Sequence, residues 1–263
     1  MVCERGSDKW FYGASAVVFA ASTVATILWC RSMSAMGGDM LMPGGWTMPM
    51  TWMRMPGQTW VGMASSFIGM WAVMMAAMML PSLVPMLRRY REAAGGAGAR
   101  WLGARTVLVG VGYFFVWTLI GMAVFPVGVG VGVAEMLHPG LSRAVPVAVG
   151  VLVVLVGALQ LTAWKARVLA CCRADQPIGA LPTGVTAAWR HGLRLGVACA
   201  RGCVGLMVLL VVLGVMDLRV MAVVAVGVTA ERLAPAGDRV ARGIGWVVIG
   251  AGAFLVARSV GLG

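Results

Sequence analysis

Methionine is concentrated in one part of this chain. Fifteen of the 21 methionines fall between Met33 and Met86, a window of 54 residues. Thioether sulfur is a soft, uncharged ligand that suits Cu(I) and few other biological ions. The window first crosses a Gly- and Pro-rich segment, whose candidate ligands are Met48, Met50, Met53 and Met55. It then enters an apolar segment, whose candidate ligands are Met70, Met74, Met75, Met78 and Met79.

The methionines of the apolar segment have helical spacing. Residues four apart lie on nearly the same face of a helix, about 6 Å apart along its axis. Met70, Met74 and Met78 therefore form one column, and Met75 and Met79 form a second column beside it. We predict that both columns face neighbouring helices and bind Cu(I). The alternatives are that these methionines only fill gaps in helix packing, and that the loop methionines only lie among lipid headgroups.

A second group of soft ligands lies further along the chain. Cys199 and Cys203 are four residues apart and share a helix face, and His191 lies two turns earlier on the same side. The adjacent Cys171 and Cys172 precede them. Thiolate and imidazole would make a tighter acceptor for Cu(I) at the end of a methionine-lined path. The alternative is that the cysteines are only small or buried residues at helix contacts.

The composition of the chain indicates that these candidate ligands belong to a membrane protein. The chain is 60% apolar with a mean hydropathy of +0.90, and 11% of its residues are charged, against roughly 25% in soluble domains. Apolar runs of about 20 residues, the length of a transmembrane helix, recur along it. We therefore predict an all-α, polytopic membrane helix bundle that forms a single unit over residues 1–263. The seven predicted spans are about 10–30, 60–86, 104–126, 144–164, 193–216, 219–234 and 242–260.

The basic residues between the spans indicate the orientation. Fifteen of the 21 Lys and Arg residues lie on the side of the N-terminus and five lie on the other side. This asymmetry predicts a cytoplasmic N-terminus in a bacterial inner membrane. It places the methionine-rich loop, 31–59, outside and the cysteine-bearing loop, 165–192, in the cytoplasm, where thiols stay reduced. Because the orientation accounts for the net charge of +12, no nucleic-acid partner is expected.

Two charged residues fall within the predicted spans. Arg201 lies inside the fifth span and Glu231 lies near the inner end of the sixth. A charge within a membrane is costly unless it is paired, so we predict a structural ion pair between the two, with proton or ion movement through Glu231 as the alternative. Pro126 and the alternating Gly and Val residues at 127–133 are weak helix formers, which predicts an irregular stretch there.

The motifs together resemble a known bacterial family of predicted metal-binding integral membrane proteins. Its hallmark is similar to the stretch Met70-Trp71-x-x-Met74-Met75-x-Ala77-Met78-Met79-x-Pro81. Further matches are Gly112-Tyr113-x-x-x-Trp117, Gln160 with Lys165, Cys171-Cys172-Arg173, Gly196-x-x-Cys199-x-x-x-Cys203 and Glu231-Arg232. The resemblance implies a multi-span protein that binds metal, and it supplies no reaction. The family often has two adjacent cysteines where Gly202-Cys203 stands here.

The expected function is the binding of copper as Cu(I) and its transport or handling across the membrane along the methionine-lined helix. No enzyme is expected. A monooxygenase-type copper or di-iron centre needs several His or carboxylate ligands at one level of the membrane, whereas the predicted topology separates His138 from His191. The alternative is a non-catalytic accessory subunit of a larger membrane complex. The expected partners are the lipid bilayer and a metallochaperone or a membrane-complex partner, and self-association is left open.

Overall fold

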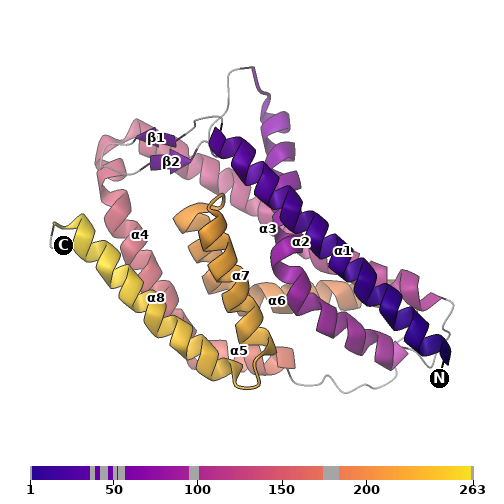
Figure 1. The fold of residues 1–263 in the computed structure, drawn as a ribbon. Coiled ribbons are helices and arrows are strands. Elements are labelled where there is room, and N and C mark those ends of the chain that lie inside the picture. Colours follow the sequence, from indigo (N-terminus) through magenta and orange to yellow (C-terminus); the bar gives the residue numbers. More distant parts are fainter. Residues whose placement is uncertain are drawn as a thin grey trace.

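The computed structural model describes residues 2–35, 39–41, 47–49, 52, 57–94, 101–173 and 184–261. Nearly all of them are helical, which confirms the predicted all-α bundle (Figure 1). The helices are α1 (Val2–Ala35), α2 (Trp60–Ala94), α3 (Leu102–Leu137), α4 (Pro139–Gln160), α5 (Ala163–Arg173), α6 (Val185–Gly214), α7 (Leu218–Leu233) and α8 (Gly237–Ser259). Within the predicted loop 31–59, two short antiparallel strands, β1 (Asp39–Leu41) and β2 (Thr47–Pro49), pair Met40 with Met48.

Six helices of the described chain are long and apolar enough to cross a membrane: α1, α2, α3, α4, α6 and α8. The segment predicted as the sixth span, 219–234, instead forms α7. Its 16 residues rise about 24 Å along the helix axis, which is less than the roughly 30 Å of a bilayer's hydrocarbon core. The predicted count of seven spans is therefore corrected to six long helices and one shorter helix.

Two segments predicted to be irregular or looped are helical. Helix α3 continues through Pro126 and the Gly-Val stretch to Leu137. In apolar surroundings the backbone groups have no water to bond, so they remain paired within the helix. The predicted loop 165–192 also overlaps α5, and α6 begins at Val185, before the predicted span does.

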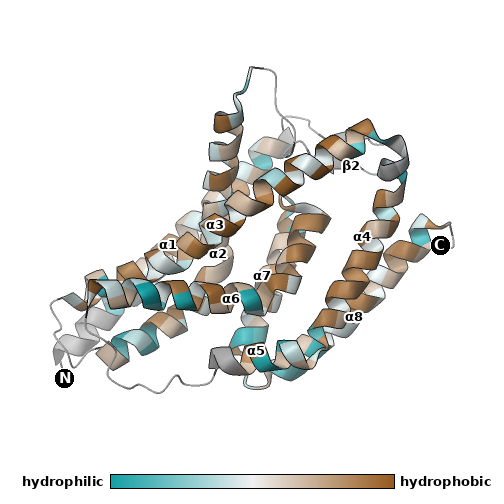
Figure 2. Ribbon diagram, turned by 180° about the vertical axis from the view of Figure 1, so that it is seen from behind, coloured by the Kyte–Doolittle hydropathy of each residue, from teal (hydrophilic) through white to brown (hydrophobic). Residues whose placement is uncertain are grey.

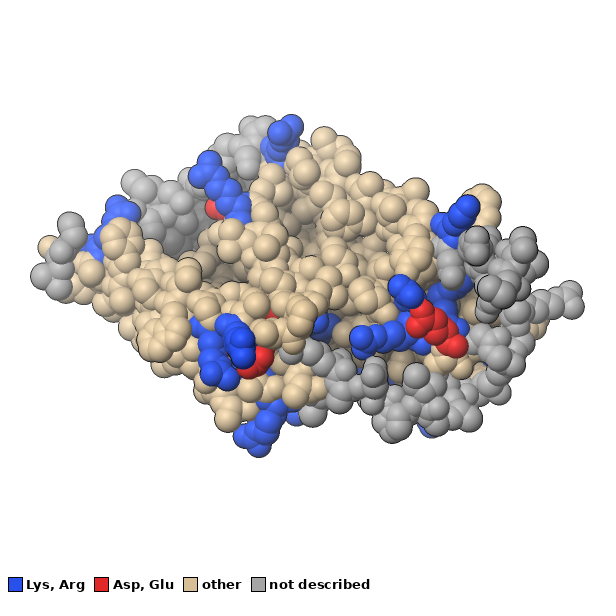
Figure 3. Space-filling model, turned by 60° about the horizontal axis from the view of Figure 1, so that its bottom comes forward, with Lys and Arg blue, Asp and Glu red and all other residues tan. Residues whose placement is uncertain are grey.

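The strongest helix contacts are between α4 and α8 and between α3 and α6. Figure 1 shows α4 and α8 side by side, while α3 packs on α6 and α2 contacts α1, α3 and α7. The N-terminus, α5 and the α7–α8 turn lie toward the lower end in this view, and the β1–β2 hairpin lies at the upper end. Hydrophilic residues gather on α5 and along the first half of α6 (Figure 2). Figure 3 shows Lys and Arg side chains around the lower face, with few acidic ones.

Glycines allow the closest helix contacts. A Cβ atom at Gly192 of α6 would lie 2.3 Å from the carbonyl oxygen of Val109 in α3. A Cβ atom at Gly157 of α4 would lie 2.8 Å from the carbonyl oxygen of Gly245 in α8. Real Cβ atoms do not approach oxygen so closely, so a larger residue at either position would push the helices apart. Small residues are the usual means of bringing membrane helices together.

Candidate metal-binding site

The five methionines of α2 that were predicted to bind copper are all buried. Their exposed fractions are 4% for Met70, 1% for Met74, 0% for Met75, 3% for Met78 and 0% for Met79. Neighbouring parts of the chain cover both columns, so the predicted inward orientation is confirmed. Burial alone would also follow if these residues only filled space in the core. The contacts of the sulfur atoms are therefore the informative observation.

The methionine columns of α2 meet a cysteine of α6. The thioether sulfur of Met79 lies 3.9 Å from the thiol sulfur of Cys199, although the two residues are 120 positions apart in the chain. Both side chains are completely buried. We call Met79 and Cys199 the sulfur pair. Met75 lies one turn away on α2 and Cys203 lies one turn away on α6, and both are also buried.

The Cys199 sulfur accepts a hydrogen bond from α3. The hydroxyl of Tyr113 donates to Cys199 Sγ at 2.9 Å, and both groups are buried. Gly196 makes this contact possible, because a Cβ atom there would lie 2.9 Å from the Tyr113 carbonyl oxygen and would hold α3 away from α6. The thiol of Cys203 points to the backbone instead and donates to the Cys199 carbonyl oxygen at 3.0 Å.

Two buried tryptophans join α2 to α3. Trp71 Nε1 donates to the carbonyl oxygen of Trp117 at 2.9 Å, and its ring occupies the space that a Cβ atom at Gly121 would need. The indole N–H of Trp117 is buried and has no hydrogen-bond partner in the described part of the chain. Trp117 lies one turn after Tyr113 on α3. An unpaired buried donor is costly, and a negatively charged sulfur is a stronger acceptor than a neutral one.

An aromatic cluster adjoins the N-terminal end of the methionine columns. The ring of Phe67 lies 5.3 Å from Trp52, 5.9 Å from Trp71 and 5.3 Å from Phe125, measured between centroids. Trp52 belongs to the methionine-rich loop, and its ring lies where a Cβ atom at Gly128 of α3 would be. The loop is thus anchored beside the columns. Met48 lies in β2, whereas Met50, Met53 and Met55 lie outside the described residues.

The predicted imidazole ligand is not next to the cysteines. The ring of His191 stacks on Tyr90 of α2 with centroids 5.3 Å apart. It lies eight residues before Cys199, which is about 12 Å along the helix. Cys171 and Cys172 lie in α5, but the structure describes only their backbone. The part of the chain that the structure describes holds no cluster of three or more His, Cys, Asp or Glu residues able to bind a metal.

The partner predicted for Glu231 is corrected. Glu231 Oε2 lies 2.6 Å from Nζ of Lys165, and its Oε1 accepts from Nε2 of Gln160 at 2.6 Å. Lys165 Nζ also donates to the Gly202 carbonyl oxygen at 2.5 Å, and these three side chains are buried. Arg201 is exposed. Residues two apart on a helix point about 200° apart, so Arg201 cannot share the inward face of Cys199.

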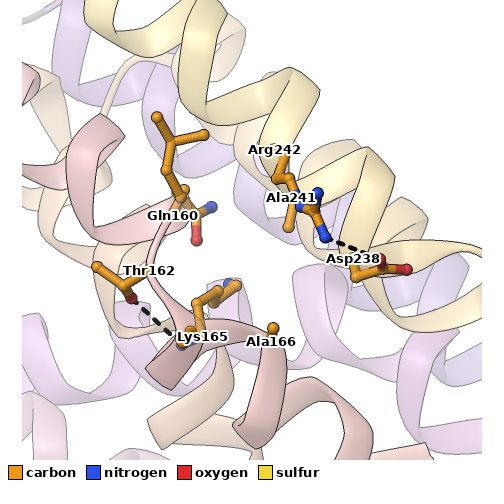
Figure 4. A pocket seen from close by; sticks show the side chains of 9 residues that line it. Gln160, Thr162, Lys165, Ala166, Asp238, Ala241 and Arg242 are labelled. Carbon is orange, nitrogen blue, oxygen red and sulfur yellow. Dashed lines mark hydrogen bonds and ion pairs between the residues drawn. The ribbon is translucent and has the colours of Figure 1, made fainter.

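Sequence reasoning placed Lys165 in a loop and in a family motif with Gln160, and gave it no role in the site. The available signal was the match of Gln160, Lys165 and Glu231 to the motifs of one family. A cavity of about 320 Å³ lies beside this ion pair. Figure 4 shows that Gln160 and Lys165 line it together with Asp238 and Arg242 of α8, which form an ion pair at 3.4 Å. The buried ion pair therefore borders a polar cavity where α4, α5 and α8 meet.

The fold and the sulfur pair define a class of protein: a helix bundle of the membrane type that collects soft ligands in its core. Comparison with known families agrees with this class. Residues 68–255 match the family described as PpoB2, a copper chaperone. This match covers more than half of the chain, so the protein belongs to this copper chaperone family. The matched region contains the sulfur pair and the Lys165–Glu231 ion pair. No curated protein and no solved structure matches the chain.

Proposed function

We propose that the protein binds Cu(I) at the sulfur pair and passes it across the bacterial inner membrane along the methionine columns of α2. The observation that carries this proposal is the 3.9 Å contact between Met79 Sδ and Cys199 Sγ. It brings the buried methionine columns of α2 into contact with a thiol of α6, a helix that is distant in the sequence. Membership of a copper chaperone family supports copper as the metal.

The ligand set favours the cuprous ion. Thioether and thiolate are soft ligands, which select Cu(I) over harder divalent ions. When Cu(I) replaces the proton of one thiol, the copper and the thiolate together carry no net charge, and one proton is released. The thioethers add no charge. A neutral assembly avoids the large cost of placing an isolated ion in an apolar core.

The columns give a bound ion a route. Successive methionines of a column lie about 6 Å apart along the helix axis, so each turn of α2 offers the next thioether. The columns run from the sulfur pair toward the aromatic cluster that anchors the methionine-rich loop. We propose that this loop, outside the cytoplasm, exchanges copper with a partner metallochaperone, and that the protein performs no catalysis.

An accessory subunit, the alternative, could meet other proteins through helix faces made of small residues. Two of these small residues are used within the chain. Gly192 packs against the Val109 carbonyl and Gly196 packs against the Tyr113 carbonyl, both in α3. Because these two glycines already pack against α3, they do not support an interface with another protein.

Metal analysis of the purified protein tests the proposal. The protein is loaded with Cu(I) in detergent under reducing conditions, and bound copper is measured by elemental analysis. We expect Met74→Leu combined with Met78→Leu to lower copper binding, because leucine preserves the side-chain volume and removes the sulfur. Cys199→Ser should abolish tight binding. The matched control is Met122→Leu on α3, where the methionine is exposed. Equal copper in all variants would disprove a sulfur site on α2 and α6.

A further inference from the structure

Among the described thiols, Cys199 and Cys203 differ in the hydrogen bonds they make. The Cys199 sulfur accepts from the Tyr113 hydroxyl at 2.9 Å and donates its own S–H toward the Met79 sulfur at 3.9 Å. The Cys203 thiol is a donor to a backbone carbonyl. A residue of α3 therefore acts on one of the two thiols, and it is the one that touches Met79.

A second N–H donor lies on the same face of α3. Trp117 is one turn after Tyr113, so the two side chains project from the same face of the helix. Its buried indole N–H has no hydrogen-bond partner among the described residues. Unsatisfied buried N–H groups are rare in proteins and often mark a group that a ligand or a charge satisfies.

We propose that Tyr113 is a positioning residue for copper, with Trp117 as a second donor. Tyr113 orients the Cys199 sulfur toward Met79 and stabilises it as a copper ligand by donating its O–H hydrogen bond to it. The unpartnered N–H of Trp117 becomes a second donor when copper converts this thiol to a thiolate. This inference rests on the proposed function. In this proposal α3 sets the copper affinity of the site, although no ligand was predicted on that helix.

The physical basis is the effect of hydrogen bonds on a metal-bound sulfur. Donors that point at the sulfur withdraw electron density from it and fix its direction. Partners that orient a metal ligand typically change metal affinity 10- to 100-fold when they are removed. In the apolar core each such hydrogen bond is stronger than it would be in water. The Tyr113 ring is itself held in place by the glycine contacts between α3 and α6, so its hydroxyl reaches the sulfur without rearrangement.

Tyr113→Phe tests the proposal by removing one oxygen atom. The detergent-purified protein is titrated with Cu(I) against a competing Cu(I) chelator under anaerobic, reducing conditions. We expect the copper dissociation constant to rise about 10- to 100-fold. We also expect the charge-transfer absorption of the copper-bound sulfur to move to longer wavelength, since a sulfur without the donor holds its electrons less tightly. Tyr90→Phe is the matched control, because Tyr90 stacks on His191 outside the sulfur pair.

Two further variants make the outcome decisive. Trp117→Phe removes the second donor while keeping an aromatic ring, and it should shift the absorption in the same direction. Tyr113→Phe in a Cys199→Ser background should lose no more affinity than Cys199→Ser alone, because Tyr113 acts through that sulfur. Wild-type affinity and absorption in Tyr113→Phe, together with copper loss in Cys199→Ser, would overturn the role of Tyr113 and leave the proposed function intact. Wild-type affinity in Cys199→Ser would refute the sulfur pair itself.

Discussion

Two buried polar sites lie within one turn of each other on α6. One is the Cys199 sulfur, which accepts from Tyr113. The other is the carbonyl oxygen of Gly202, which accepts from Lys165. Because Lys165 is paired with Glu231 of α7, the ion pair ties α5 and α7 to the backbone of α6 three residues after the thiol. The pair therefore holds in place the segment of α6 that carries Cys199.

Removing one charge of this buried pair should destabilise the protein strongly. Glu231→Gln leaves the Lys165 ammonium buried without an anion, which typically costs 3–5 kcal/mol. The free energy of unfolding, measured in detergent by chemical denaturation, checks this expectation. Combining Glu231→Gln with Lys165→Met removes both charges and should recover most of the loss.

The matched control for this prediction is Glu92→Gln. Glu92 pairs with Arg88 at 2.7 Å, but both side chains are largely exposed. An exposed pair on one helix contributes at most about 1 kcal/mol. Equal stability of Glu231→Gln and Glu92→Gln would contradict a structural role for the buried pair.

At the scale of helices, glycine contacts set the spacing of α4 and α8. A Cβ atom at Gly252 would lie 2.7 Å from the Val154 backbone nitrogen and 2.9 Å from the Gly150 carbonyl oxygen. The contact between Gly157 and Gly245 repeats this arrangement two turns away. Exposed apolar side chains such as Trp246 and Phe254 cover other parts of α8. Helix α8 therefore packs through its glycines and presents its large residues outward.

Gly252→Leu should separate α8 from α4. Overpacking of this kind costs about 1–3 kcal/mol or more, because the neighbouring atoms are backbone and cannot turn away. The loss appears as a lower temperature of aggregation in detergent. Gly250→Leu on the same helix is the control, since nothing lies within 4 Å of a Cβ atom there. A Gly250→Leu protein as unstable as Gly252→Leu would contradict this account of α8.

Helix periodicity predicted one part of the site and could not predict the other. The four-residue spacing of Met70, Met74 and Met78 was sufficient to place them on one buried face. The donor from Tyr113 could not be predicted in this way, because it joins residues 86 positions apart. The pairing of Glu231 with Lys165, 66 positions apart, was missed for the same reason. Local spacing shows which residues share a helix face, whereas partners across helices depend on how the helices pack.

At the scale of the whole molecule, the positions of the N-terminus and of the turns fit helices that run alternately up and down the bundle. The N-terminus, α5 and the start of α8 lie toward one end of the bundle, and the β1–β2 hairpin lies at the other (Figure 1). Lys and Arg residues surround the first end (Figure 3). The direction in which this bundle inserts stays a prediction from the basic residues.

Cysteine labelling in intact cells tests the orientation. Thr59 precedes α2 and Thr186 lies in the first turn of α6, and both are exposed. We expect Thr59→Cys to react with a membrane-impermeant maleimide in cells whose outer membrane alone has been opened. Thr186→Cys should react only after the inner membrane is opened as well. The parent protein gives the background from its own cysteines. The reverse pattern would invert the predicted topology.

The distance in sequence between Met79 and Cys199 also affects how the protein is made. The Met79 thioether is synthesised 120 residues before the Cys199 thiol, and the long helices α3 and α4 and the short helix α5 come before α6. A nascent chain that ends before α6 holds the methionine columns without the cysteine. On the proposed function, metal binding at the completed pair is therefore a late event of biogenesis, and ribosome-arrested chains of increasing length should retain copper tightly only once α6 has emerged.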